Sequence, residues 1–374
     1  MAQILQSTQK QVSRLVTALR IIVSSPVGIV RVTNAAMAKA QMRLRSSYCP
    51  AMPTSVAIEV TNLCSGDCVL CPVGQGRRSR SLGMIEWDNF TRLVDEVSPY
   101  VTFIGLYNWG EPLMHPRIYD MIEYVKARKI HAEVSSNLHN LETEDSERLV
   151  RSGLDVLGVA LHGLSEETYR NYQPRHRFVD VINKVKAVCE TKRRLGSQTP
   201  EIRLDYIVRS DNECEAPLLP DFAANLGVGH FLEETSLNLR LLPYDRTMKP
   251  RNVSEEQLRK ERLELMDRWL PKDDAKVNPV YRMVRENGGI MPSGGQKIFQ
   301  CTNPWHHMII CWDGDVDLCC GSYEKRYSVG NVFGASVREV WNNSRYRAAR
   351  RSIRNKKQES DPWILCDVCP GMLL

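Results

Sequence analysis

The sequence predicts an α/β protein whose parallel strands curl into a barrel or partial barrel, followed by a small cysteine-rich domain. Three observations predict this class. Strand-like and helix-like segments alternate from residue 55 onward, which is typical of parallel α/β architecture. Polar motifs follow several of the strand-like runs, and barrels carry their functional residues at the carboxyl ends of their strands. The cysteines are clustered near residues 64–71 and 301–369.

Six strands are expected, at residues 55–60, 101–106, 132–135, 156–161, 202–208 and 237–242. Helices are expected between them, for example over 86–97, where Phe90, Leu93, Val94 and Val97 share one face. Crossovers between parallel strands are right-handed. A series of six such units therefore curls in one direction and brings its strand ends to one mouth.

Residues 1–53 are expected to form a helical extension. Apolar residues recur at helical spacing over 12–23, with Lys10, Arg14 and Arg20 among them, which predicts an amphipathic helix. Pro26 and Gly28 are expected to end it, and a second helix is expected over 33–46. Packing on the barrel or in a dimer is the main interpretation, and peripheral membrane contact through the N-terminal helix is the alternative. No apolar run approaches the ~20 residues of a membrane span.

Three cysteines follow the first expected strand at C-x3-C-x2-C spacing: Cys64, Cys68 and Cys71. Soft sulfur ligands select zinc, copper(I) or iron-sulfur clusters. A set of three leaves one metal position without a local protein ligand, and an open position is where chemistry occurs. A zinc knuckle with a distant fourth ligand is the alternative.

This motif resembles the signature of the radical S-adenosylmethionine (radical SAM) enzymes. The resemblance implies that the three cysteines hold a 4Fe-4S cluster, which binds S-adenosylmethionine and cleaves it to a 5'-deoxyadenosyl radical. It also implies an open (β/α)6 partial TIM-type barrel and an electron donor such as flavodoxin or ferredoxin. Relatives usually have an aromatic residue where Leu70 stands, so Leu70 is expected to be an apolar wall against the cofactor.

Two further segments resemble cofactor-binding motifs of that family. After the second strand, the run Asn108-Trp109-Gly110-Glu111-Pro112 is similar to a Gly-Gly-Glu-Pro segment that binds the cofactor's amino group, with Trp109 in place of the first glycine. After the third strand, the run Ser135-Ser136-Asn137 is similar to a polar strand end that contacts the ribose and carboxylate. A simple turn and a loop cap are the respective alternatives.

Two residues are candidates for the chemistry itself. His162 ends the fourth strand, and a histidine there can accept a proton because its pKa lies near working pH. An ordinary solvated histidine is the alternative. Cys214 follows the fifth strand on a loop, where a free thiol can donate a hydrogen atom to a substrate radical.

The C-terminal cysteines resemble the SPASM and shorter twitch extensions of radical SAM enzymes. Asp313-Gly314 between two apolar runs predicts a hairpin, which would return the chain toward Cys301. The resemblance implies one auxiliary 4Fe-4S cluster, because a two-cluster domain needs more cysteines. Its expected ligands are Cys301, Cys319, Cys366 and Cys369, with Cys320 as the alternative to Cys319.

These features divide the 374 residues into four parts. We expect a helical extension over 1–53, the barrel over 54–244, a helical connector over 245–298 and the auxiliary cluster domain over 299–374. Clustered rather than paired cysteines suit metal sites in a reducing cytoplasm. The net charge of +6 from 50 basic and 44 acidic residues supports no nucleic-acid partner.

The resemblance implies a choice of reactions. The leading hypothesis is abstraction of a hydrogen atom from a hydroxyl-bearing carbon of a small, sugar-like or aminocyclitol-like substrate, which gives oxidation or epimerisation. Modification of a peptide is the alternative; relatives of that kind often begin with a leader-binding domain, for which 53 residues are too few. A non-catalytic iron-sulfur electron carrier is the hypothesis from a different class.

Overall fold

The computed structural model describes residues 26–142, 144–235, 237, 239–291, 301–355 and 364–369. The amphipathic helix predicted over 12–23 lies outside these residues. Within them, no helix is both long enough and apolar enough to pass through a membrane.

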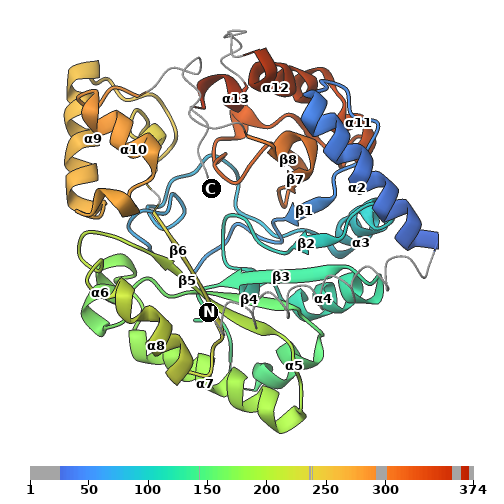
Figure 1. Ribbon diagram of the computed structural model, residues 1–374, viewed down its shortest axis with the longest axis horizontal. Coiled ribbons are helices and arrows are strands. Elements are labelled where there is room, and N and C mark those ends of the chain that lie inside the picture. The colour runs from blue at the N-terminus through green and yellow to red at the C-terminus, as the bar shows by residue number, and fades with distance from the viewer. Residues whose placement is uncertain are drawn as a thin grey trace, which may run out of the picture.

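One curved sheet organises the molecule (Figure 1). Its strands are ordered β6-β5-β4-β3-β2-β1-β7-β8-β9, and β1 to β6 are parallel. This confirms the predicted α/β class with a partial barrel. The six barrel strands are β1 (Ser55–Ile58), β2 (Phe103–Gly105), β3 (His131–Ser136), β4 (Val156–Ala160), β5 (Glu201–Ile207) and β6 (His230–Glu234).

Helices alternate with these strands and line the outer side of the sheet (Figure 1). The predicted apolar face of α3 is buried at all four positions, because it packs against the sheet. The helices of the barrel are α3 (Trp87–Val97), α4 (Ile118–Ala127), α5 (Asp145–Arg151), α6 (Glu166–Tyr172), α7 (Phe178–Leu195) and α8 (Leu219–Asn225).

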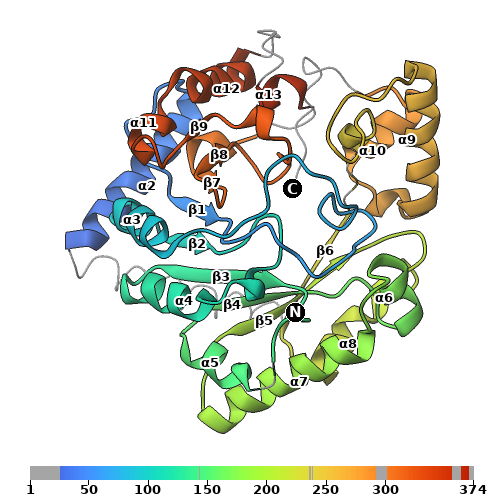
Figure 2. The same cartoon turned by 180° about the vertical axis from the view of Figure 1, so that it is seen from behind.

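The C-terminal part extends the same sheet. Strand β7 (His307–Ile310) pairs in parallel with β1, and β8 (Asp315–Asp317) and β9 (Gly330–Asn331) follow as an antiparallel meander. The predicted hairpin is confirmed, with Ile310 opposite Val316 and Gly314 at φ +83°. Helices α11 (Val337–Trp341), α12 (Ser344–Asn355) and α13 (Leu365–Val368) cover this end, as Figure 2 shows from behind. The buried core runs through the barrel and this extension without a break.

The sixth strand was predicted in the wrong place. Strand β6 lies at His230–Glu234, and the apolar run at 237–242 contains a short 3-10 helix, Leu239–Leu241. Leu237 and Leu239 are buried because they pack in a second apolar cluster with Met266 and Trp269. Both partners lie on α9 (Glu255–Trp269), and α10 (Pro279–Glu286) contributes to the same cluster. Strand β6 is exposed along its whole length, so it carries no apolar pattern.

The N-terminal helix prediction also needs correction. Helix α2 runs over Pro26–Leu44, so the second helix begins at Pro26 and not near residue 33; the predicted end of the first helix borders residues outside the described ranges. Proline suits the first helical turn, where its missing N–H would have no intrahelical acceptor. Gly28 lies inside α2 and is buried, which leaves room for close packing.

Candidate functional site

The three-cysteine loop leaves the carboxyl end of β1 and coils tightly on itself. The Cys71 amide donates to the Cys68 carbonyl at 3.1 Å, and the Gly66 amide donates to Cys64 Sγ at 3.3 Å. A Cβ atom on Gly74 would lie 2.4 Å from the Cys68 carbonyl oxygen, which is closer than carbon and oxygen can approach. Glycine at this position therefore allows the loop to close around the cysteines.

The electrostatics of these thiols fit a cluster. Burial, followed by the charges of its neighbours, raises the pKa of Cys64 to about 12 and that of Cys68 well above its usual value, and burial raises the pKa of Cys71. The charge of Cys71 raises the pKa of both Cys64 and Cys68, so the three thiols lie near one another. Thiols of this kind become ligating thiolates only beside a metal cation, and iron would supply that charge.

The spacing of possible ligands is also informative. Within the described ranges, no three His, Cys, Asp or Glu side chains gather closely enough to hold one metal ion. A 4Fe-4S cluster binds each thiolate through a separate iron. The three sulfur donors on one loop therefore suit the cluster that the motif predicts.

The segment after β2 docks against the start of this loop. Gly110 has φ +107°, and a Cβ atom on it would lie 2.4 Å from the Thr61 carbonyl oxygen. The Glu111 amide donates to the Leu63 carbonyl at 2.7 Å. Glycine at position 110 thus permits the contact that places this segment beside Cys64.

Glu111 ties the ends of β2 and β3 together. Its buried carboxylate accepts hydrogen bonds from Ser136 Oγ at 2.7 Å, from the Asn137 amide at 2.8 Å and from the Leu113 amide at 3.0 Å. Burial raises the pKa of this carboxyl group. Glu111 thereby holds the polar end of β3 next to the cysteine loop, and its contact with the cofactor stays a prediction.

The other predicted cofactor contacts surround the same point. Asn137 Nδ2 donates to Cys64 Sγ at 3.8 Å, and Ser135 lines the main cavity described below. Asn108 donates to the buried Glu59, Pro112 is buried in a 3-10 turn, and Leu70 is buried in the second apolar cluster. The structure brings these residues to one side of the sheet, and their roles toward the cofactor stay predictions.

A cavity of about 600 Å³ opens at the carboxyl ends of the strands. An ion network lies in it: Arg203 donates to Asp205 Oδ1 at 2.6 Å and to Glu133 Oε1 at 3.0 Å, and Tyr107 donates to Glu133 at 2.9 Å. Burial raises the pKa of Asp205 against the effect of Arg203. The polar residues that line the cavity include Tyr107, Ser135, Arg203, Asp205, Glu234, Lys276, Arg282 and Cys320.

The two predicted catalytic residues are not among those that line this cavity. His162 is buried, its Nδ1 accepts from the Ile207 amide at 3.2 Å, and its ring packs edge-on against Tyr172. Burial, then the charge of Arg209, lowers its pKa to about 3, so it is a poor proton acceptor. Cys214 is exposed on a turn after β5. Asp205 and Cys320 line the cavity instead.

Two of the C-terminal cysteines lie near Tyr346 of α12. Cys319 and Cys366 both influence the pKa of buried Tyr346, which burial raises first. Cys320 lines the cavity and is exposed, whereas Cys319 is half-buried. The two adjacent cysteines therefore differ in surroundings, and Cys319 as the ligand stays a prediction.

We expect Cys301→Ala or Cys366→Ala to remove one cluster, because each takes away one of four thiolates. Cys311→Ala is the matched control: Cys311 is fully buried and donates to Asp317, so both clusters should remain. Iron and acid-labile sulfide counts after anaerobic reconstitution measure the difference. Unchanged iron in the first two variants would show that other residues are the ligands.

An ion network missed by the sequence reasoning joins the first cysteine loop to the C-terminal extension. Buried Arg80 pairs with Asp315 at 2.8 Å and with Asp317 at 3.0 Å. Beside it, burial raises the pKa of Glu59 to about 8, and Glu59 Oε1 has no hydrogen-bond partner among the described residues. Glu59 could have been found from the sequence, because it is a carboxylate that directly follows β1 at the mouth end. No sequence pattern pointed to Arg80.

Trp109, which replaces the first glycine of the expected segment, makes contacts that a glycine could not make. Its indole Nε1 donates to the Ser322 carbonyl at 2.9 Å, and its ring meets Tyr323 edge-on with centroids 5.2 Å apart. Ser322 lies two residues after Cys320. The bulky side chain thus links the segment beside the first cysteine loop to the second cysteine set.

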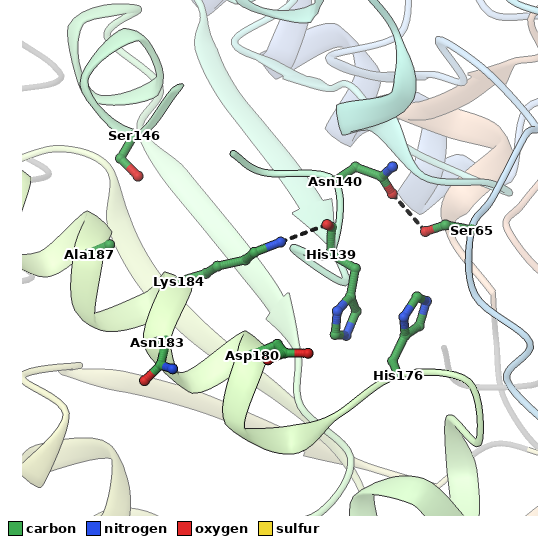
Figure 3. A pocket seen from close by; sticks show the side chains of 9 residues that line it. All are labelled: Ser65, His139, Asn140, Ser146, His176, Asp180, Asn183, Lys184 and Ala187. Atoms are coloured by element: carbon green, nitrogen blue, oxygen red, sulfur yellow. Dashed lines mark hydrogen bonds between the residues drawn. The ribbon is translucent and has the colours of Figure 1, made fainter. Parts of the chain in front are cut away.

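A second cavity, of about 380 Å³, lies outside the barrel mouth between the loop after β3 and helix α7 (Figure 3). His139 and His176 stack there with centroids 3.7 Å apart, and Ser65 donates to Asn140 at 2.6 Å. Lys184 points toward His139 and donates to its carbonyl (Figure 3). This cavity touches the cysteine loop through Ser65.

Comparison with known proteins agrees with this geometry. Residues 58–199 match the Radical SAM superfamily, and residues 301–370 match SPASM, an iron-sulfur cluster-binding domain. The chain is similar to the tungsten-containing aldehyde ferredoxin oxidoreductase cofactor-modifying protein of Pyrococcus furiosus, with 24% identity over 80% of this chain and 83% of the relative. It is also similar to an AdoMet-dependent heme synthase of Methanosarcina barkeri, with 28% identity over 32% of this chain and 34% of the relative.

Two solved structures share the fold. SuiB of Streptococcus suis, bound to S-adenosylmethionine, aligns with a TM-score of 0.60 and 15% identity over 99% of this chain and 85% of that one. The enzyme anSMEcpe, with bound AdoMet and a Cp18Cys peptide, aligns with a TM-score of 0.50 and 12% identity over 78% and 81%.

Proposed function

Because the chain belongs to the radical SAM superfamily and carries a SPASM iron-sulfur domain, we propose that it oxidises a hydroxyl-bearing carbon of a small, sugar-like or aminocyclitol-like substrate. S-adenosylmethionine and 4Fe-4S clusters are the cofactors of these two domains. When bound, they supply the radical that takes a hydrogen atom and the acceptor that takes one electron. The chain itself must then take the hydroxyl proton.

The observation that carries this proposal is the cavity with Asp205 on its wall. Its volume of about 600 Å³ lies within the ~300–1,000 Å³ of small-molecule sites. Ser135, a predicted cofactor contact, hydrogen-bonds to Asp205 and lines the same cavity, so a substrate bound there would meet Asp205 beside the predicted cofactor position. The carboxyl pKa, raised by burial, makes Asp205 a stronger base than a solvated aspartate.

Arg203 supports this role in two ways. Its guanidinium binds both Asp205 oxygens, at 2.6 and 3.1 Å, which fixes the carboxylate's orientation. Its third contact, to Glu133, keeps the Arg203 side chain from turning away from Asp205. Lys276 and Arg282 also line the cavity and offer cationic donors to the remaining hydroxyl or anionic groups of the substrate.

A relative's name adds support. The protein from Pyrococcus furiosus, aligned over 83% of its length, is named for modifying an enzyme's cofactor. A cofactor is a small molecule, which suits the cavity better than an extended peptide does. Binding of a precursor peptide is stated for SuiB, so modification of a peptide is the second candidate.

We expect Asp205→Asn to lower turnover about 100-fold or more, the usual contribution of a general base. In the wild type, kcat/KM should fall as pH falls through the raised Asp205 pKa, because protonation removes the base; the variant should lack this limb. Asp211→Asn is the matched control, since Arg209 holds Asp211 in the same two-bond geometry at 2.9 and 3.1 Å and Asp211 is not among the residues lining the cavity.

The reaction class is tested with a panel of polyols and aminocyclitols deuterated at one carbinol carbon. Transfer of that deuterium to 5'-deoxyadenosine, with formation of a ketone, supports oxidation. In deuterated water, deuterium at a carbon of an isomeric product would instead show epimerisation, for which Cys320 is the thiol lining the cavity. Turnover of a peptide but of no polyol would replace the small-molecule proposal.

A further inference from the structure

Helix α2 turns small and polar side chains inward and leaves most of its large apolar side chains in solvent. Its buried positions are Gly28, Arg31, Asn34 and Ala38, whereas Val27, Ile29, Val30, Val32, Met37 and Leu44 are exposed. Ile29 and Leu44 have 57% and 77% of their surface in solvent. A helix on a protein normally buries its large apolar side chains, so packing alone does not account for those that α2 leaves in solvent.

The inward polar residues hold α2 in that orientation. Arg31 donates to the carbonyls of Ser98, Arg128 and Lys129 at 2.8–3.1 Å. Ser98 and Arg128 cap the carboxyl ends of α3 and α4, where a cation is favoured by the helix dipoles. Asn34 exchanges two hydrogen bonds with the Met52 backbone. The apolar face is thus fixed outward by specific contacts.

The charge carried by this part of the sequence has one sign. Lys39 and Arg43 are exposed on α2. The first acidic residue of the whole chain is Glu59, so residues 1–58 contain seven cations, at positions 10, 14, 20, 31, 39, 43 and 45, and no anion. Apolar side chains flanked only by Lys and Arg are the composition of helices that lie on anionic membranes.

We propose that the exposed apolar face of α2 docks the protein on an anionic lipid surface. The apolar side chains would enter the headgroup boundary while Lys39 and Arg43 meet acidic headgroups. This binding is peripheral, and it is independent of the radical chemistry proposed above.

The position of α2 decides what such docking can do. Arg31 binds the carboxyl ends of α3 and α4, which precede strands β2 and β3, so α2 lies at the amino ends of the barrel strands. It runs along the right-hand edge in Figure 1 and the left-hand edge in Figure 2. The cavity opens at the opposite ends of the strands. Docking would therefore anchor the enzyme with its mouth facing the aqueous phase, so the substrate arrives from water.

Flotation of the reconstituted full-length protein tests the proposal. Vesicles of phosphatidylcholine with phosphatidylglycerol should carry the protein, vesicles of phosphatidylcholine alone should carry much less, and added salt should weaken binding through screening. Ile29→Glu should lower the partition coefficient about tenfold or more, because an apolar contact is lost and an anion is added. Arg43→Gln should lower it about fivefold.

Leu218→Glu is the matched control, since Leu218 is 59% exposed on a different surface; its flotation should equal the wild type. Equal flotation of Ile29→Glu and Leu218→Glu would overturn the proposal. So would a lipid-free dimer, seen by light scattering, that Ile29→Glu converts to monomer while flotation stays at background, because a second copy of the chain would then cover α2. Each variant's iron content confirms that it has folded.

Discussion

Replacing Cys64, Cys68 and Cys71 together by alanine is expected to leave about half of the iron and to abolish cleavage of S-adenosylmethionine. Two 4Fe-4S clusters correspond to about eight irons per chain, held by separate cysteine sets. The three thiols share one tight loop next to Glu111 and Asn137. Their loss removes every ligand of one cluster and none of the predicted ligands of the other.

Iron and sulfide analysis with a 5'-deoxyadenosine assay measures both effects. Cys49, Cys189 and Cys214 changed together to alanine form the matched control: none is an expected ligand, and the variant should keep its iron and its cleavage activity. Stoichiometric zinc in the wild type after anaerobic reconstitution would contradict the assignment, as would full iron retention in the first triple variant.

Arg80→Ala is expected to lower the free energy of unfolding by about 3–5 kcal/mol, the usual cost of removing one partner from a buried ion pair. Arg80 has 5% of its side chain exposed and faces Asp315 and Asp317, and Asp317 is fully buried. Without the guanidinium, these carboxylates stay buried with less compensating charge. Because Arg80 follows the first cysteine loop and the aspartates lie on β8, the two cysteine sets should also loosen relative to each other.

Anaerobic chemical denaturation of the holoprotein measures the loss. Arg151→Ala provides the control, because the side chains of Arg151 and its partner Glu147 are 62% and 39% exposed and surface pairs contribute little. A loss of stability equal in the two variants would show that the Arg80 network is unimportant. A shifted spectrum of either cluster in Arg80→Ala alone would show that the network also positions them.

The sequence by itself determined the chemistry class and most of the barrel. Cysteine spacing is local, so the metal-binding loop was readable without knowing what packs on it. Five of the six barrel strands were also placed correctly, because buried parallel strands are short apolar runs between helices with one apolar face. The Asp313-Gly314 turn is local as well, and the hairpin formed as expected.

Only the tertiary structure decided which polar groups face the cavity. His162 ends a strand as a catalytic residue would, but Arg209 and Tyr172 pack around it, and that burial suppresses its basicity. Asp205 and Cys320 lie more than 100 residues apart in sequence and line one cavity. The apolar run at 237–242 packs on α9 and not in the sheet. Apolar residues record that a segment is buried, and the partner that buries it is set by contacts distant in sequence.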